Sequence, residues 1–578
     1  MKNTFKKRGQ RFLRKFSRAS VKAGEEGKEH LKENLLMRVS HIANVKLLVV
    51  EWGLLVGALV LFAITQAFWF GSSYAENVFS EGGTYTEATL GNVKSMNPLF
   101  ATTSSEKVLS KLMFATLSTI DYSGHSGIGL AKSIRPNDDG TVWTVKLRKD
   151  LKWSDGEPIT ADDVIFTAEI IKNPLVNTIY DSNLSKVKVE KGENEEIIFN
   201  LPSAYADFIT ALNFPIIPKH VLEDTDPQNL IENNFSNAPV TSGAFSFNAI
   251  QTSGNSEEKV FYLSANPDYY KGKVLLNSFA VHTYATKDEI INAVNSGSVT
   301  ATAELSGKET EQIKNSNFIS KNSSLNYGTF VFFNTKSELA KNLEFRAAIR
   351  EGINLDKIRA AAPDTLPLDF PLLKSQITLS RYPELPERNV EAAENKIAEL
   401  FPESKPEISL VTVNSGYLPQ VAEVLKEELE NLGCGVNLEV YEENQDFIGN
   451  VVAKRSYDIL LYDIELGTDP DLLPYFHSSQ ASSSGLNLSN YRNPLVDDLI
   501  LGARDTLDRD LRTRKYEAIL DYLANSVPAI GLYQPNLTYY YNKNVRTFGN
   551  SVRLVTAIDR FSDINMWATS KSSKNKTP

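Results

Sequence analysis

The sequence predicts an α/β protein with more than one lobe, preceded by a single transmembrane helix. Its 578 residues are too many for one hydrophobic core, so two or three lobes are expected. Residues 408–440 follow the order strand, helix, strand, which is typical of a parallel α/β unit. Residues 47–70 form a long apolar segment near the N-terminus.

The apolar segment 47–70 is long enough to cross a bilayer. No charged residue occurs between Trp52 and Phe70. As a helix rising ~1.5 Å per residue, the segment spans about 36 Å, against about 30 Å for the hydrocarbon core. We therefore expect an uncleaved signal-anchor helix. A cleaved signal peptide is the alternative, because Ser73-Tyr74-Ala75 has the small-x-small pattern of a cleavage site.

Charge differs sharply between the two sides of this segment. Residues 1–46 carry a net charge of +9, whereas residues 76–578 carry −18. A basic segment before the apolar one predicts a cytoplasmic N-terminus, with residues 71–578 outside the cell or in the periplasm. The tail 1–46 is either a basic amphipathic helix on the membrane surface or a disordered segment that sets orientation. The acidic body argues against nucleic-acid binding, which needs a basic surface.

Residue types that build metal or catalytic centres are sparse or scattered. The single cysteine, Cys434, excludes an intramolecular disulfide and supplies no lipid-attachment site after the apolar segment. The six histidines form no cluster with zinc-ligand spacing. The sequence also lacks a Walker loop, a Gly-x-Gly-x-x-Gly motif and a Gly-x-Ser-x-Gly motif. We therefore predict a non-enzymatic protein without a cofactor or metal.

Strand and helix patterns follow a polar linker at 71–83. Helical spacing occurs at 107–117 and 418–432. Alternation or short apolar runs predict strands at 84–90, 141–147, 330–335, 408–413, 436–440 and 527–533.

A turn and a capped helix are expected within residues 151–174. Asp155-Gly156 is a turn signal. Thr160 and Asp163 have the spacing of a capping box, so a helix should begin after Thr160. Pro174 should end that helix. Caps and apolar faces account for these residues, and we expect no ligand contact from them.

Short blocks of residues occur in a fixed order between residues 151 and 528. The first reads Leu-Lys-Trp-Ser-Asp-Gly-Glu-Pro-Ile-Thr-Ala-Asp-Asp-Val-Ile-Phe-Thr, over 151–167. Together the blocks resemble bacterial extracellular solute-binding protein family 5, the oligopeptide- and dipeptide-binding type, over roughly residues 84–560. The other main blocks are Phe214–His220, Pro239–Phe247, Asn266–Gly272 and Phe345–Asn354.

The resemblance implies a two-lobed periplasmic-binding-protein type II-like fold with an extra subdomain in the first lobe. It also implies two adjacent connections between the lobes, near 327–335 and 528–534, which act as a hinge. The expected parts are a basic cytoplasmic tail (1–46), the transmembrane helix (47–70), a linker (71–83), the first lobe (84–326) with its inserted subdomain (about 116–238), the second lobe (327–530), a return to the first lobe (531–565) and a tail (566–578).

Proteins of this family capture a solute between the lobes and deliver it to an ABC importer. For this chain the resemblance implies a membrane-tethered, monomeric peptide receptor. Its partners would be the peptide, the permease subunits and membrane lipid around residues 47–70. Two alternatives stay open. The same scaffold would bind a non-peptide solute (a sugar oligomer, a nickel chelate or haem), or the protein would be a surface chaperone or sensor without a role in transport.

Three carboxylates are candidates to bind the amino terminus of a peptide. In peptide-binding members an acidic residue just before an Asp-Pro-Asp-like stretch pairs with that buried ammonium group, since an unpaired buried charge is costly. Asp463, Glu465 and Asp469 lie in this window, and spacing favours Glu465. The alternative for Asp469 is a purely structural role, with Asp471, in a loop around Pro470.

Two tyrosines are candidates to line the cleft. Tyr462 lies just before the acidic window, and Tyr491 follows it. Aromatic side chains give a ligand broad contact at a low cost in conformational entropy. The alternative for each tyrosine is packing in the core.

Overall fold

A computed structural model describes residues 46–575, except 74, 122–123, 177, 179, 181–183, 185, 253–257, 443–446 and 550–552. The chain divides into two units. One comprises Met1–Val78 and Ser572–Pro578, and the other is the body, Phe79–Lys571.

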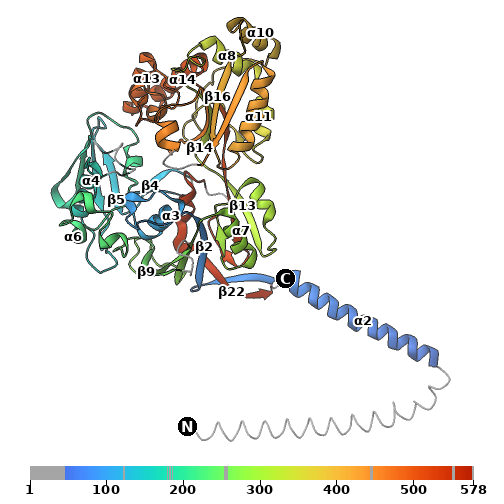
Figure 1. Cartoon of the computed structure of the whole chain (residues 1–578). Helices are drawn as coiled ribbons and strands as arrows, with labels where there is room; N and C mark the ends of the chain where they lie inside the picture. Colours follow the sequence, from blue (N-terminus) through green and yellow to red (C-terminus); the bar gives the residue numbers. More distant parts are fainter. Residues whose placement is uncertain are drawn as a thin grey trace. The chain divides into compact units, whose positions relative to one another are not determined.

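The first unit contains helix α2 (Lys46–Ser73), followed by strand β1 (Ala75–Ser80) (Figure 1). The predicted transmembrane segment 47–70 falls within α2. In the described part of the chain, no helix is both long enough and apolar enough to cross a membrane. The membrane anchor therefore stays a prediction. The predicted basic tail lies outside the described residues, apart from Lys46.

The first lobe of the body is built on a seven-stranded sheet with the order β13-β20-β12-β2-β11-β10-β9. Its centre is parallel, because β2 pairs in parallel with both β11 and β12. The strand predicted at 84–90 is confirmed as β2. The strands are β2 (Thr84–Leu90), β9 (Phe245–Thr252), β10 (Lys259–Ala265), β11 (Ser278–Tyr284), β12 (Ala301–Thr302), β13 (Phe318–Ser324) and β20 (Asn536–Asn542).

Helix α3 (Ser104–Met113) begins three residues earlier than predicted. Thr103 and Glu106 form a capping box, in which the Glu106 amide donates to Thr103 Oγ1 at 3.2 Å and the Thr103 amide donates to Glu106 Oε2 at 3.0 Å. The predicted start at 107 missed this box. The predicted end at 117 was also wrong, because the chain turns at Phe114 towards strand β3 (Ser118–Ile120).

A four-stranded antiparallel sheet, with the order β5-β6-β8-β7, forms a subdomain beside the first lobe. The predicted capping box is confirmed at its helix α4 (Ala161–Lys172), since the Thr160 amide donates to Asp163 Oδ2 at 2.8 Å. The other elements between residues 126 and 222 are β4 (Ser126–Ile128), β5 (Ala131–Pro136), β6 (Val142–Leu147), β7 (Lys188–Lys191), β8 (Ile197–Asn200) and α6 (Lys219–Leu222). Helix α7 (Lys287–Ser296) packs on the seven-stranded sheet of the first lobe.

The second lobe has a six-stranded mixed sheet with the order β15-β19-β14-β18-β16-β17. Strand β16 pairs in parallel with β17 and β18, which confirms the predicted parallel unit. Figure 1 shows α11 lying beside β16. The strands are β14 (Tyr327–Phe333), β15 (Leu366–Pro367), β16 (Glu407–Val413), β17 (Gly435–Tyr441), β18 (Ile459–Glu465) and β19 (Ala529–Gln534). The helices are α8 (Leu343–Gly352), α9 (Leu355–Ala360), α10 (Val390–Leu400), α11 (Leu418–Asn431), α12 (Leu473–Phe476), α13 (Pro494–Asp505) and α14 (Arg509–Ser526).

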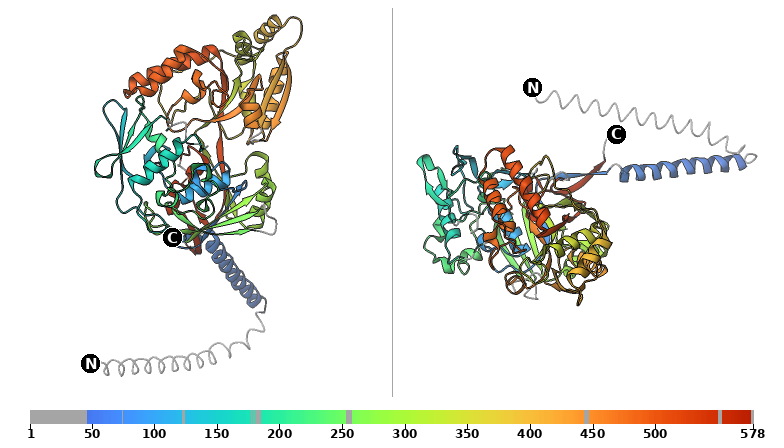
Figure 2. Two further views of the ribbon diagram at one scale, coloured as in Figure 1. Left: turned by 60° about the vertical axis from the view of Figure 1, so that its left-hand side comes forward. Right: turned by 90° about the horizontal axis from the view of Figure 1, so that it is seen from above.

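Each lobe has its own hydrophobic core, and two short connections join the lobes. The chain passes from β13 to β14 through Leu325-Asn326, and from β19 to β20 through Pro535. The connections are adjacent, since the Leu325 amide donates to the Pro535 carbonyl at 3.0 Å and Gln534 Nε2 donates to the Leu325 carbonyl at 2.7 Å. The remaining short strands, β21 (Val545–Arg546) and β22 (Ala568–Asn575), follow this return to the first lobe. Figure 2 shows the subdomain with α4 on the same side of the body as α14.

Candidate functional site

A cavity of about 650 Å³ lies between the two lobes. The first lobe lines it with α3, with segments of the subdomain between Tyr180 and Pro215, and with the short helix η11 (Ala557–Met566). The second lobe lines it with Tyr327 and with residues between Glu465 and Tyr475. A solute in this cavity would contact both lobes, which is the arrangement needed for a ligand to stabilise lobe closure.

Glu465, the favoured sequence candidate, ends strand β18 and lines this cavity. Tyr327 donates its hydroxyl hydrogen to Glu465 Oε2 at 3.1 Å, and Tyr475 donates to the Glu465 backbone carbonyl at 2.5 Å. The carboxylate is accessible from the cavity but surrounded by protein. This burial raises its pKa, and the nearby Asp559 carboxylate adds to the effect. In the described residues no cation forms an ion pair with it.

Cationic side chains line the opposite wall of the cavity. Lys107 and Lys111 project from α3. Lys111 pairs with Asp559 at 3.2 Å, whereas Lys107 is exposed to the cavity and has no ion-pair partner among the described residues. The cavity therefore offers a carboxylate on the second lobe and an ammonium group on the first. Such a pair suits a zwitterionic ligand.

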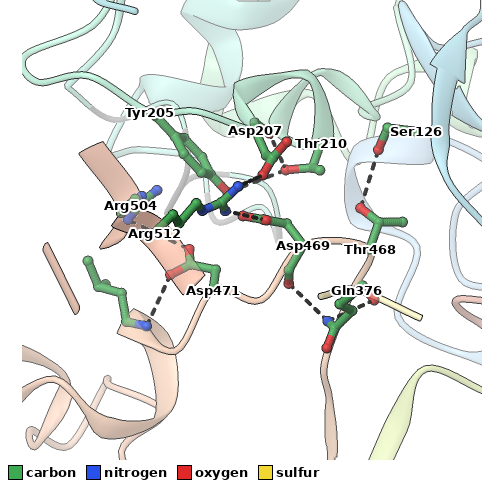
Figure 3. Close-up of polar contacts among 12 residues, drawn as sticks. Ser126, Tyr205, Asp207, Thr210, Gln376, Thr468, Asp469, Asp471, Arg504 and Arg512 are labelled. Atoms are coloured by element: carbon green, nitrogen blue, oxygen red, sulfur yellow. Dashed lines mark hydrogen bonds and ion pairs between the residues drawn. The ribbon is translucent and has the colours of Figure 1, made fainter. Parts of the chain in front are cut away.

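Arg512 connects the two lobes and contacts Asp469, which lines the cavity (Figure 3). Its guanidinium lies 2.5 Å from Asp469 of the second lobe and 2.5 Å from Asp207 of the first-lobe subdomain. Burial and the adjacent Asp207 carboxylate raise the pKa of Asp469 well above its usual range, despite Arg512. The pKa of Asp207 is lowered. Burial alone would raise it, but the hydrogen bond with the Asp469 carboxyl and the charge of Arg512 together outweigh burial. We call Asp207, Asp469 and Arg512 the interlobe clasp.

Further contacts flank the clasp in Figure 3. The Arg504 guanidinium lies 4.1 Å from the centre of the Tyr205 ring and 3.8 Å from Asp471. Elsewhere on the seam, the hydroxyl groups of Ser126 and Thr468 lie 3.2 Å apart. The Arg504–Tyr205 and Ser126–Thr468 contacts join the subdomain to the second lobe, so the structure shows the lobes in contact across the cavity.

The other predicted residues lie in different places. Asp463 and Tyr462 line a separate cavity of about 330 Å³, and Asp463 accepts a 2.6 Å hydrogen bond from Thr329. Asp469 lines the main cavity, but its carboxylate is bound by Arg512 in the clasp. This position is closer to the structural role given above as the alternative than to ligand binding. Tyr491 is buried in the core of the second lobe, where its hydroxyl accepts from Ser526 Oγ at 3.0 Å.

Sequence reasoning missed Lys107, Tyr205, Asp207, Tyr475 and Arg512. They come from four separate segments, each with its own local pattern, and only the fold brings them together. Arg512 lies within an ordinary amphipathic helix, α14, among other charged residues. No local signal in the sequence distinguishes it from its neighbours.

A family model for bacterial extracellular solute-binding proteins, family 5 (Middle), matches residues 128–485. The chain belongs to this family. The predicted resemblance is thereby confirmed at the level of the family, whose members are solute-binding proteins rather than enzymes. In the described residues no group of three His, Cys, Asp or Glu side chains is placed to hold a metal ion.

Among curated proteins, the family 5 chain is similar to the oligopeptide-binding protein AppA of Bacillus subtilis (strain 168). The two are 26% identical over 484 residues, which cover 79% of this chain and 87% of AppA. A shorter match links it to the periplasmic oligopeptide-binding protein OppA of Escherichia coli (strain K12), with 35% identity over 133 residues, 23% of each chain.

Solved structures confirm the two-lobed α/β fold. AppA from Bacillus subtilis, in complex with a nonapeptide, gives a TM-score of 0.71 at 23% identity and covers 86% of this chain and 100% of AppA. NikZ from Campylobacter jejuni, in complex with Ni(L-His), gives 0.72 at 22% identity and covers 84% and 99%. At these identities the likeness shows the fold alone.

Proposed function

We propose that this family 5 protein is a membrane-tethered receptor that captures short peptides between its lobes and presents them to an ABC permease. The observation that carries the proposal is the position of Glu465. Its carboxylate lines the interlobe cavity without a cationic partner among the described residues. A carboxylate that lines a cavity between two lobes without such a partner favours a ligand that brings its own positive charge.

The remaining cavity groups suit the rest of a peptide. Tyrosines at 180, 205, 327 and 475 offer broad, adaptable contact surfaces, and Lys107 offers a partner for a carboxylate. The names of relatives agree with a peptide ligand, since AppA is called an oligopeptide-binding protein. DppA from Helicobacter pylori, solved with the peptide STSA, has a TM-score of 0.72 at 20% identity. Asp463, Asp469, Tyr462 and Tyr491 have weaker claims to ligand contact, for the reasons given above.

Glu465→Gln should weaken binding of peptides with a free amino terminus by about 10- to 100-fold, because a charge-assisted hydrogen bond contributes roughly 1.5–3 kcal/mol. Titration calorimetry with synthetic tetra- to nonapeptides measures the effect. Acetylated versions of the same peptides should bind the parent weakly and be insensitive to the substitution. Asp463→Asn is the matched control, since Asp463 lines a different cavity. An equal loss in both variants, or no loss in Glu465→Gln, would refute the assignment.

Helix α2 supports the proposed tether. Its described side chains, 50–66, include ten large apolar ones that are more than half exposed, among them Trp52, Leu54 and Phe62. A helix that exposes apolar side chains on every face needs an apolar environment. Together with the basic residues before it, this favours an anchor with a cytoplasmic N-terminus.

The tether predicts that the full chain resists extraction of native membranes with alkaline carbonate. Leu59→Arg, at the middle of the apolar segment, should release a substantial fraction, because a central arginine costs about 2.5–3.5 kcal/mol of insertion free energy. Mass spectrometry of the mature protein provides the second measurement. A chain that begins at Glu76 would show that the segment is a cleaved signal peptide.

A further inference from the structure

A second and larger cavity, of about 1130 Å³, adjoins the connections between the lobes. Successive residues of an extended chain point to opposite faces. At the connections, Ser324, Asn326 and Gln534 line this cavity, whereas their neighbours Leu325, Tyr327, Tyr533 and Pro535 line the cavity of about 330 Å³. Asn322, before the first connection, lines both cavities. The second cavity therefore lies behind the hinge, on the face opposite Tyr327 and the proposed peptide site. We call it the rear cavity.

The rear cavity is bounded by both lobes. Its first-lobe side consists of the end of β13 and Arg553. Its second-lobe side is the irregular segment 366–385, which presents mainly apolar side chains. Leu366 and Tyr382 remain 52% and 37% exposed. The apolar side chains on this wall include Leu366, Leu368, Phe370, Leu372, Leu373 and Leu385.

The two basic side chains of the rear cavity lack ionic partners, whereas its carboxylate has one. Lys374 and Arg553 line it, and neither side chain makes an ion pair or hydrogen bond in the described part of the chain. The cavity's carboxylate, Asp369, is neutralised by Arg359 at 2.5 Å. The lining therefore combines an apolar wall with uncharged polar residues and an excess of positive charge.

Either cation of the rear cavity, Lys374 or Arg553, could pair with a carboxylate head group.

From these groups we infer that the rear cavity is a second binding site, which takes an amphiphilic anion with an acyl chain and a carboxylate head. The chain would lie along 366–385, and the head would meet Lys374 and Arg553. Because its walls belong to both lobes, the affinity of the occupant differs between open and closed states, and binding biases the lobes towards the state that fits it. This site is separate from the proposed peptide site.

Photolabelling of the full chain in phosphatidylcholine nanodiscs tests the site. The probe is a ten-carbon carboxylic acid with a diazirine near its tail, and the control is the amine of equal length. We expect saturable adducts within residues 366–385 from the acid but not from the amine. The double variant Lys374→Gln/Arg553→Gln should raise the half-saturating concentration about tenfold.

Two further variants keep the test specific. Leu366→Glu alters an exposed position of the apolar wall and should also weaken labelling, whereas Lys336→Gln, an exposed lysine elsewhere on the second lobe, should not. The proposal is overturned by equal labelling with the amine, by unchanged labelling in the double variant, or by adducts confined to other segments.

Discussion

Replacing Arg512 with glutamine is expected to open the lobes. In the parent, the guanidinium is shared by Asp207 and Asp469, whose side chains are 36% and 6% exposed. The variant leaves two facing carboxyl groups without their common cation. Removing one partner of a buried, hydrogen-bonded charge set costs about 2–5 kcal/mol. Lobe closure, and with it ligand affinity, should therefore weaken by roughly 30- to 5000-fold.

Electron paramagnetic resonance measures this opening directly. Spin labels at Lys149→Cys and Asp498→Cys, exposed positions on the two lobes, report the interlobe distance. The distribution should move to longer distances in Arg512→Gln and return towards the parent when Asp469→Asn is added, because the stranded charge is then removed. Arg514→Gln, two residues later on the same helix and exposed, is the matched control. A parental distribution in Arg512→Gln would contradict a role for the clasp in closure.

The second large effect concerns stability. Arg560→Met should destabilise the first lobe by about 3–5 kcal/mol, because it leaves Glu87 charged and unpaired in the core. Both side chains are almost fully buried, with Arg560 Nη2 2.6 Å from Glu87 Oε1. Tyr539 also donates to Glu87, at 2.9 Å, but supplies no charge.

Guanidinium denaturation, followed by tryptophan fluorescence, measures this loss. The exposed pair Lys188–Glu190 provides the control, since Lys188→Met should change stability by no more than about 1 kcal/mol. Adding Glu87→Gln to Arg560→Met should recover part of the loss, because a neutral amide is cheaper to bury than a carboxylate. If Arg560→Met shifts the denaturation midpoint no further than Lys188→Met, the buried pair is not essential to the lobe.

The sequence was most informative where secondary structure depends on local residues. Strand 84–90 and the helix capped by Thr160 and Asp163 occur as predicted, because alternation and a capping box are visible within a few residues. The start of α3 was wrong because the Thr103–Glu106 box was overlooked. By contrast, local residues do not show that Pro535 connects the lobes, because that depends on which distant strands pair.

The site was only partly predictable for the same reason. Glu465 could be nominated because it lies beside a block that resembles the family. Tyr491 could not be assigned to a cavity or to the core, since both environments favour a tyrosine, and it lies in the core. The clasp joins residues 207, 469 and 512, and its geometry exists only after both lobes have folded and closed.

Native mass spectrometry of the full chain, purified in detergent from cells grown in rich medium, tests peptide capture most directly. Denaturation of the same sample then releases bound molecules for identification. The proposed function predicts a heterogeneous set of short peptides with free amino termini, retained by the parent and depleted in Glu465→Gln. Release of a single sugar or a metal chelate, retained equally by both proteins, would contradict it.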